Sequence, residues 1–394
     1  MTDPGPYRNT MARHPSPPPG LHWIPSAVAI LALAGACDQE DAAEEGDSPP
    51  EAIGSTALPL SESHQVALLA DERTACVIDS YETRVRCVDR EGTVVGVFGR
   101  GGEGPGEFGI GSSDNLGNLD LVRGEEGTIG VYDGLLFRFT IFEPSGAYVS
   151  DVRAPFLHPL RSFGTVLTGV VWRGWIPDSL MTRYDVNIAS GEVVREEASP
   201  SGPWEVTCGE GAWGIPNRAK GWVIGTCEGH LIFVGNTGDD TALPVPAYLP
   251  DERDMARLEE SLWAGQSRLG PEEMSRVLEW TSDGTYRSWV DQTLEDYRAR
   301  PKPYSLGAEH RLIDAANRFW IATQRDTHEW SYLDVYENAR YAGSVRVRDR
   351  LRAFDVLGST LVVLVDRQVG PDDADGVPDR ALDWYDIGDS RLGR

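Results

Sequence analysis

Apolar and polar residues alternate in short runs from about residue 54 to the C-terminus, and Gly, Asp, Asn and Pro separate these runs. A period of two indicates strands, because successive side chains of a strand point to opposite faces of the sheet. The runs recur as a unit of strand, tight turn, strand, Asp-rich turn and strand. The clearest copies begin at Thr74, Gly127 and Asn317, and weaker copies begin near Val166, Trp213 and Thr360.

Units of roughly 45 residues with four strands each are typical of a β-propeller, whose blades stack around a central axis. We therefore expect an all-β fold, a six-bladed β-propeller over residues 54–394. The last copy, with runs at 361–366 and 380–386, has no fourth strand. A strand near residues 56–60 would complete this blade and close the ring, which hides strand edges that otherwise invite aggregation.

Residues 251–299 break the alternation and predict a small helical insertion between blades four and five, lying over one face of the disc. Met255, Leu258 and Leu262 recur at helical spacing, Gly265 suits a helix end, and Pro271 opens a second helix. A third helix precedes Pro301. Three tryptophans within this segment either pack the insertion onto the blades or form an exposed partner-binding patch: Trp263, Trp280 and Trp289.

Residues 98–108 read Phe-Gly-Arg-Gly-Gly-Glu-Gly-Pro-Gly-Glu-Phe. This segment resembles the Gly-Pro-Gly-Glu-Phe connector of six-bladed propeller lipoproteins of the NHL-repeat-like superfamily, and the resemblance covers most of residues 55–394. It implies that the segment joins the outer strand of one blade to the inner strand of the next. Function does not follow, since propellers host many unrelated activities. The same residues match G-x-G-x-x-G, but Pro105 and Gly106 disfavour the helix that a dinucleotide site needs.

The N-terminus predicts export. Arg8 and Arg13 precede an apolar run over 24–36 that is too short to span a bilayer comfortably. The run ends Leu-Ala-Gly-Ala-Cys37, which resembles a bacterial lipobox and implies a lipid on Cys37. Residues 1–37 are then a signal peptide, and the acidic residues 38–53 are a disordered tether. We expect a protein of the bacterial cell envelope with its lipid in a membrane; simple secretion and an uncleaved anchor are the alternatives.

The sequence contains five cysteines, and four remain when Cys37 is set aside as the lipid site. The other four flank two hairpin-like turns, so we expect Cys76–Cys87 and Cys208–Cys227 disulfides, which are stable in an oxidising compartment. Buried free thiols are the alternative.

The formal charge of −26 argues against a nucleic-acid partner, whose phosphates require a basic surface. Three carboxylates near the C-terminus resemble a calcium loop: Asp373, Asp375 and Asp379. A solvated turn without any cofactor is the favoured interpretation, and calcium is the alternative.

No catalytic residue can be named, because the sequence contains neither an HExxH pair nor a G-x-S-x-G elbow. We expect a binding or interaction scaffold for a protein, peptide or glycan. The alternative is a lactonase-like hydrolase or lyase, with or without a metal, that uses the central channel. Four or more acidic, Asn or His side chains at one mouth of the channel would favour the enzyme.

Overall fold

The computed structural model divides the chain into two units, residues 1–46 and 47–394, and every described residue belongs to the second. The structure describes residues 51–388 apart from 59, 61–62, 64, 80–81, 110–118, 125–126, 154–157, 164–165, 173–180, 199–212, 217–221, 226–228, 235–240, 303, 307–309, 326–328 and 368–378. The predicted signal peptide, lipobox and most of the tether therefore lie outside the described residues.

The described strands form six antiparallel sheets of four strands each. Five of these sheets each use four consecutive strands. The first contains β2 (Val66–Leu68), β3 (Thr74–Asp79), β4 (Arg84–Asp89) and β5 (Val94–Phe98), and the second contains β6 (Leu119–Arg123), β7 (Ile129–Asp133), β8 (Arg138–Phe142) and β9 (Tyr148–Arg153). The third contains β10 (His158–Phe163), β11 (Val166–Trp172), β12 (Met181–Asn187) and β13 (Val193–Ala198), and the fourth contains β14 (Trp213–Pro216), β15 (Trp222–Gly225), β16 (His230–Val234) and β17 (Thr241–Pro244). The fifth contains β18 (Arg311–Ile313), β19 (Phe319–Thr323), β20 (Trp330–Glu337) and β21 (Arg340–Arg348). The remaining sheet contains β22 (Arg350–Leu357), β23 (Thr360–Asp366), β24 (Arg380–Asp386) and β1 (Gly54–Leu58).

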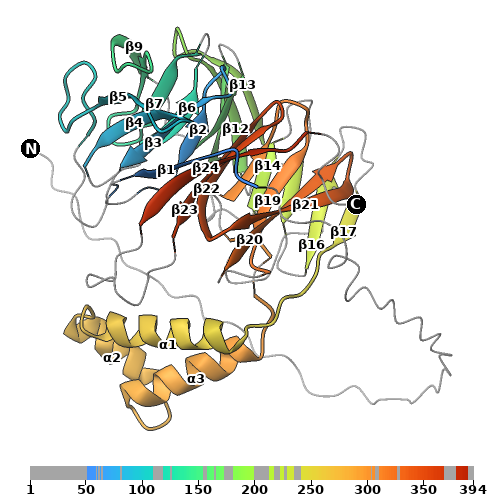
Figure 1. Ribbon diagram of the computed structural model, residues 1–394. Coiled ribbons are helices and arrows are strands. Elements are labelled where there is room, and N and C mark those ends of the chain that lie inside the picture. The colour runs from blue at the N-terminus through green and yellow to red at the C-terminus, as the bar shows by residue number, and fades with distance from the viewer. Residues whose placement is uncertain are drawn as a thin grey trace, which may run out of the picture. The chain divides into compact units, whose positions relative to one another are not determined.

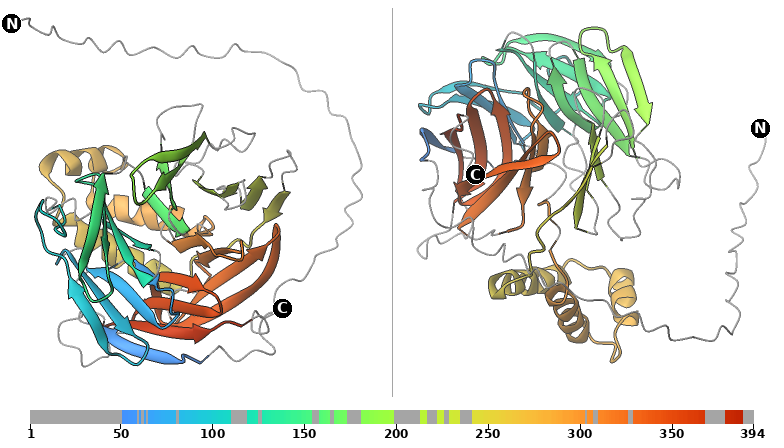
Figure 2. Two further views of the ribbon diagram at one scale, coloured as in Figure 1. Left: turned by 90° about the horizontal axis from the view of Figure 1, so that it is seen from above. Right: turned by 90° about the vertical axis from the view of Figure 1, so that its right-hand side faces the viewer.

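The sheets lie radially around a common axis (Figures 1 and 2). The first strands of neighbouring sheets contact one another, since β2 contacts both β6 and β22, and β6 contacts β10. First strands that meet at the centre and last strands at the rim are the arrangement of a propeller. The chain is therefore a mostly β protein with the propeller fold.

The N-terminal strand completes the C-terminal sheet. β1 pairs with β24 from Gly54 opposite Trp384 to Leu58 opposite Arg380. This confirms the closing strand predicted near 56–60, although the strand begins two residues earlier. The two ends of the fold therefore share one sheet, in which β1 is the outer strand and covers the edge of β24.

The core consists of apolar layers between adjacent sheets. One layer, between β19–β21 and β22–β24, includes the fully buried Trp320 and many β-branched residues. All seven residues of β23, Thr360–Asp366, are buried, as expected for a strand with paired neighbours and a sheet packed on each face. Apolar burial of this kind is the main term that stabilises the ring.

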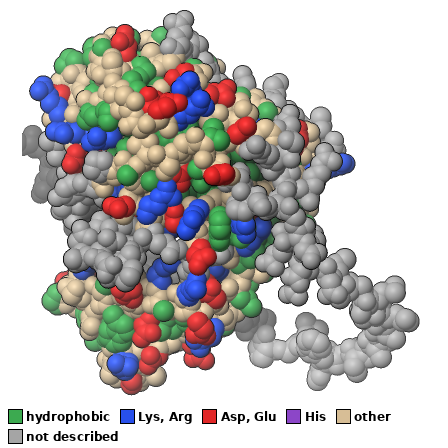
Figure 3. Space-filling model, viewed as in Figure 1, with side chains coloured by type: hydrophobic (Ala, Val, Ile, Leu, Met, Phe, Trp, Pro, Cys, Tyr) green, Lys and Arg blue, Asp and Glu red, His purple; other side chains and the backbone are tan. Residues whose placement is uncertain are grey.

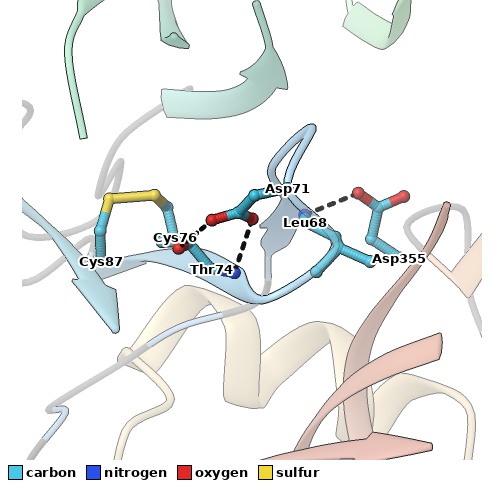
Figure 4. The surroundings of a disulfide bond; sticks show 6 residues. All are labelled: Leu68, Asp71, Thr74, Cys76, Cys87 and Asp355. Carbon is cyan, nitrogen blue, oxygen red and sulfur yellow. Dashed lines mark hydrogen bonds between the residues drawn. A yellow bond between two sulfur atoms is a disulfide. The ribbon is translucent and has the colours of Figure 1, made fainter. Parts of the chain in front are cut away.

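Cys76 and Cys87 are directly opposite in β3 and β4 and form a disulfide, which confirms one of the two predicted pairs (Figure 4). The bond lies within a buried layer between two sheets. Nearby, Asp71 accepts hydrogen bonds from the Thr74 backbone at 2.8 Å and from its hydroxyl at 2.7 Å, which fixes the turn into β3. Cys208 and Cys227 lie outside the described residues.

The Gly-Pro-Gly-Glu-Phe segment leads from β5 toward β6, from the last strand of one sheet to the first strand of the next. Phe108 is fully buried between these sheets. Glu107 accepts a hydrogen bond from the Gly104 backbone at 2.8 Å and one from Arg100 at 2.7 Å. Gly99 has a φ of +91°, and a Cβ there would lie 2.4 Å from the Phe108 ring, so the position requires glycine.

Three helices follow β17 and precede β18: α1 (Glu252–Gln266), α2 (Pro271–Glu279) and α3 (Tyr286–Arg298). Asp251 begins α1 with a capping box, Pro271 occupies the first turn of α2, and the Thr285 side chain caps α3. These helices match the helical pattern of residues 251–299, and α1 continues one residue beyond Gly265. No helix in the described part of the chain combines the length and the apolar character needed to cross a membrane.

Candidate interaction surface

A polar clamp fixes both stems of the helical insertion to the sheet β18–β21. Tyr248 precedes α1 and Tyr304 follows α3, and their rings stack with centroids 6.2 Å apart. Arg325 donates to the Tyr248 hydroxyl at 3.1 Å and to Asp334 Oδ1 at 3.0 Å. The Tyr304 hydroxyl also donates to Asp334, which is buried in β20. One buried carboxylate therefore orients groups from both stems.

Burial and the Asp334 charge raise the pKa of Tyr304 far above its usual value, so this hydroxyl remains a hydrogen-bond donor. Burial also raises the pKa of Tyr336, whose hydroxyl lies 2.7 Å from that of Tyr304. Arg325 keeps its charge, because Asp334 raises the guanidinium pKa against the opposing effect of burial. Tyr304, Tyr336 and Arg325 thus each keep one protonation state across ordinary pH.

A buried ion pair joins the two ends of the insertion. Lys302 Nζ lies 2.7 Å from Asp254 Oδ2, and the two side chains are 4% and 7% exposed. The Lys302 backbone donates to the Tyr248 carbonyl at 2.7 Å. Asp254 belongs to the first turn of α1 and accepts from the Asp251 backbone at 3.1 Å. The start of α1 and the segment after α3 are therefore held side by side.

Helices α1 and α3 pack around one tyrosine. Tyr286 contacts Trp263 edge-on at 5.4 Å and Trp289 at 5.1 Å between ring centroids. Its hydroxyl donates to the Leu262 carbonyl at 2.6 Å. Arg287 covers the Trp263 ring at 5.5 Å. Two of the three predicted tryptophans thus lie together inside the insertion, where they contact its own helices.

Trp280, the third of the predicted tryptophans, directly follows the last residue of α2 and is 72% exposed. No residue of α2 is buried. The insertion therefore has a fixed base and small aromatic core, and an outer end that presents a large apolar side chain to solvent.

The axis carries a smaller polar cluster that the sequence did not reveal. Gln65 lies just before β2. Its side-chain N–H donates a hydrogen bond to Asp120, and its side-chain oxygen accepts one from the Leu121 backbone N–H of β6. Arg123 of β6 lies 2.5 Å from Asp355 of β22, and Asp355 accepts from the Leu68 backbone at 2.8 Å (Figure 4). Three first strands are thereby cross-linked near the centre of the ring.

Asp120 is the perturbed group of this cluster. Burial raises its pKa to about 6, and the hydrogen bond from Gln65 opposes this effect only in part. Asp355 forms an ion pair with Arg123. Asp120 and Asp355 are the carboxylates on the first strands whose side chains the structure describes, which are β2, β6, β18 and β22.

The remaining predicted site residues are less informative. Cys37, Asp373 and Asp375 lie outside the described residues. Asp379 is exposed, and its carbonyl accepts a hydrogen bond from the Arg367 backbone at 2.7 Å. Within the described part of the chain, no three His, Cys, Asp or Glu side chains gather where they could hold a metal ion. The clamp residues were missed because they are widely separated in sequence, although a tyrosine on either side of the helical segment was a visible signal.

No protein-family profile and no curated relative matches the sequence. Solved structures with a similar fold include a protein of Bacteroides fragilis described as a candidate exported protein, with 11% identity, coverage of 84% of this chain and 92% of the other, and a TM-score of 0.40. Virginiamycin B lyase from Staphylococcus aureus has 10% identity, coverage of 83% and 82%, and a TM-score of 0.35. A protein of unknown function from Bacteroides caccae has 9% identity, coverage of 80% and 90%, and a TM-score of 0.40. At these values the similarity supports no statement about ligand or activity.

Proposed function

We propose that this protein is an exported lipoprotein of the bacterial cell envelope that acts as a binding scaffold. In this proposal its six sheets form one closed six-bladed ring of the NHL-repeat-like kind, and the helical insertion binds a protein partner. The observation that carries the proposal is Trp280, 72% exposed on an insertion whose base is fixed by the Lys302–Asp254 pair and the Tyr248–Tyr304 clamp.

An exposed tryptophan on a held base suits protein recognition. Tryptophan is enriched among the few residues that supply most of the binding energy in protein interfaces. A rigid support lowers the conformational entropy lost on binding. The ring has no need of Trp280, because propeller sheets bury their faces against neighbouring sheets.

The membrane anchor rests on the sequence Leu-Ala-Gly-Ala-Cys37. Cys37→Ser is expected to abolish lipidation and to release the protein from membranes. Mass spectrometry for the lipid and fractionation of cells for location test this together. An unlipidated wild-type chain that stays in the membrane would contradict the anchor and leave the scaffold proposal standing.

Replacement of residues 252–299 by a short Gly/Ser linker tests the scaffold. We expect the shortened protein to remain β-rich and to melt cooperatively, while proteins that co-purify with the full chain from the envelope are lost. Trp280→Ala, with Tyr148→Ala as a matched control at an exposed aromatic of the ring, locates the effect. A shortened protein that aggregates, or that keeps every partner, would contradict the proposal.

A further inference from the structure

A hollow of about 650 Å³ lies where the sheet β18–β21 meets the sheet that contains β22. Among the described residues, its lining includes Glu329, Trp330, Arg348, Asp349 and Arg367. The volume falls within the range of roughly 300–1,000 Å³ that small-molecule pockets occupy. None of these described lining residues belongs to the insertion. Basic and acidic side chains are interspersed between the sheets and the helices (Figure 3).

The hollow is built at the junction of two strands. Trp330 pairs with Arg348 across β20 and β21, and Asp349 is the single residue between β21 and β22. Asp349 has a φ of +69°, and its backbone N–H donates to the Glu329 carbonyl at 2.7 Å. This tight connection holds the lining residues from both sheets in fixed positions.

Trp330 supplies a flat apolar wall. The guanidinium of Arg346 lies 4.3 Å from the centre of its ring, which fixes the indole by a cation–π contact. Arg346 and Arg348 alternate with Val345 and Val347, which are buried in the core. Both arginines therefore leave the sheet on the same side as the indole.

The arginines at and near the hollow differ in whether a carboxylate forms an ion pair with them. Arg367 is held by Asp383 at 2.7 Å and also by Asp349. Arg348 and the adjacent Arg350 form no ion pair with any carboxylate in the described part of the chain. Burial and the neighbouring cations Arg352 and Arg257 lower the pKa of Arg350. Arg348 is thus the lining cation that has no carboxylate partner among the described residues, and its guanidinium is available to an anion.

We propose that the hollow binds an acidic saccharide, with the carboxylate of a uronate or sialate-type sugar on Arg348, the apolar face of a ring against Trp330, and hydroxyl groups donating to Glu329. Guanidinium groups pair strongly with carboxylates, and carboxylate side chains accept hydrogen bonds from hydroxyls. A glutamate-rich peptide fits less well, because it offers carboxylates to Arg348 but neither a ring face for Trp330 nor hydroxyl groups for Glu329.

Calorimetric titration of the full mature chain tests this proposal. The probes are galacturonate trisaccharide, a hyaluronan tetrasaccharide and sialyllactose, with the methyl-esterified galacturonate trisaccharide as a neutral match. At least one acid probe is expected to bind and to weaken with added salt, and the ester is expected to bind about tenfold or more weakly, the loss typical of a charge-assisted hydrogen bond.

Arg348→Gln and Trp330→Leu should each weaken the best acid probe about tenfold or more. Arg340→Gln, at the other end of the same strand, is the matched control and should leave the affinity unchanged. Retained melting temperatures show that the variants fold. Binding of none of the acid probes at millimolar concentration, equal binding of the ester, unchanged affinity of Arg348→Gln, or tighter binding of a glutamate-rich peptide would each overturn the proposal.

Discussion

Lys302 and Asp254, 48 residues apart, form a buried ion pair with an N–O distance of 2.7 Å. Lys302→Met would leave the Asp254 carboxylate buried without its cation, and the loss of one partner of a buried pair typically costs about 3–5 kcal/mol. Because the pair lies at the base of the insertion, we expect the helices to loosen before the ring does. Hydrogen exchange of residues 252–298 should accelerate, while β3 and β23 keep their protection.

The double variant Asp254→Asn/Lys302→Met is the control for this experiment, since it removes both charges and should recover part of the loss. Uniform acceleration across the ring strands would show that the insertion is part of the core. Unchanged exchange in the insertion would show that the pair does not hold it.

Asp120 predicts a specific pH dependence of stability. Its folded pKa is raised from 3.8 to about 6, so protonation favours the folded state. This contribution is fully present below pH about 4 and is lost as the pH rises through about 6. Asp120→Asn mimics the protonated carboxyl and should raise the free energy of unfolding by up to about 3 kcal/mol above pH 7. Urea titrations at pH 4 and pH 8 check this, and an equal effect at both values would contradict it.

The cysteines give a prediction about covalent structure. Non-reducing peptide maps should contain the Cys76–Cys87 link and also a Cys208–Cys227 link. Cys76→Ala/Cys87→Ala should lower the free energy of unfolding by about 2–3 kcal/mol, because the bond closes a short chain segment. Free Cys208 and Cys227 thiols in protein isolated from the envelope would contradict the second disulfide.

The strands were predictable because their information is local. Short apolar runs bounded by turn residues, such as 74–79 and 129–133, can be recognised without any distant partner, and the closing strand followed from the incomplete final unit. The helices were predictable for the same reason, since Pro271 and the apolar spacing around Met255 are local signals.

The sites were not predictable in this way, because their members meet only after the ring has formed. Gln65 and Asp120 are 55 residues apart, and Arg123 and Asp355 are 232 residues apart. Arg346, Arg348 and Arg350 do alternate visibly in the sequence, but their proximity to Trp330 depends on the pairing of β20 with β21. Spacing alone could not distinguish them from an ordinary solvated strand face.

Trp280 is the residue on which the proposed interaction surface depends most. A photo-crosslinking amino acid in place of Trp280 should give, in intact cells, a covalent adduct with a partner protein, and the same amino acid in place of the exposed Tyr148 should not. Mass spectrometry of the adducts identifies what has been captured. An adduct at position 280 that disappears when residues 286–298 are unfolded by Pro substitutions would support the insertion as the interaction surface. No adduct at position 280, or the same adduct at position 148, would contradict it.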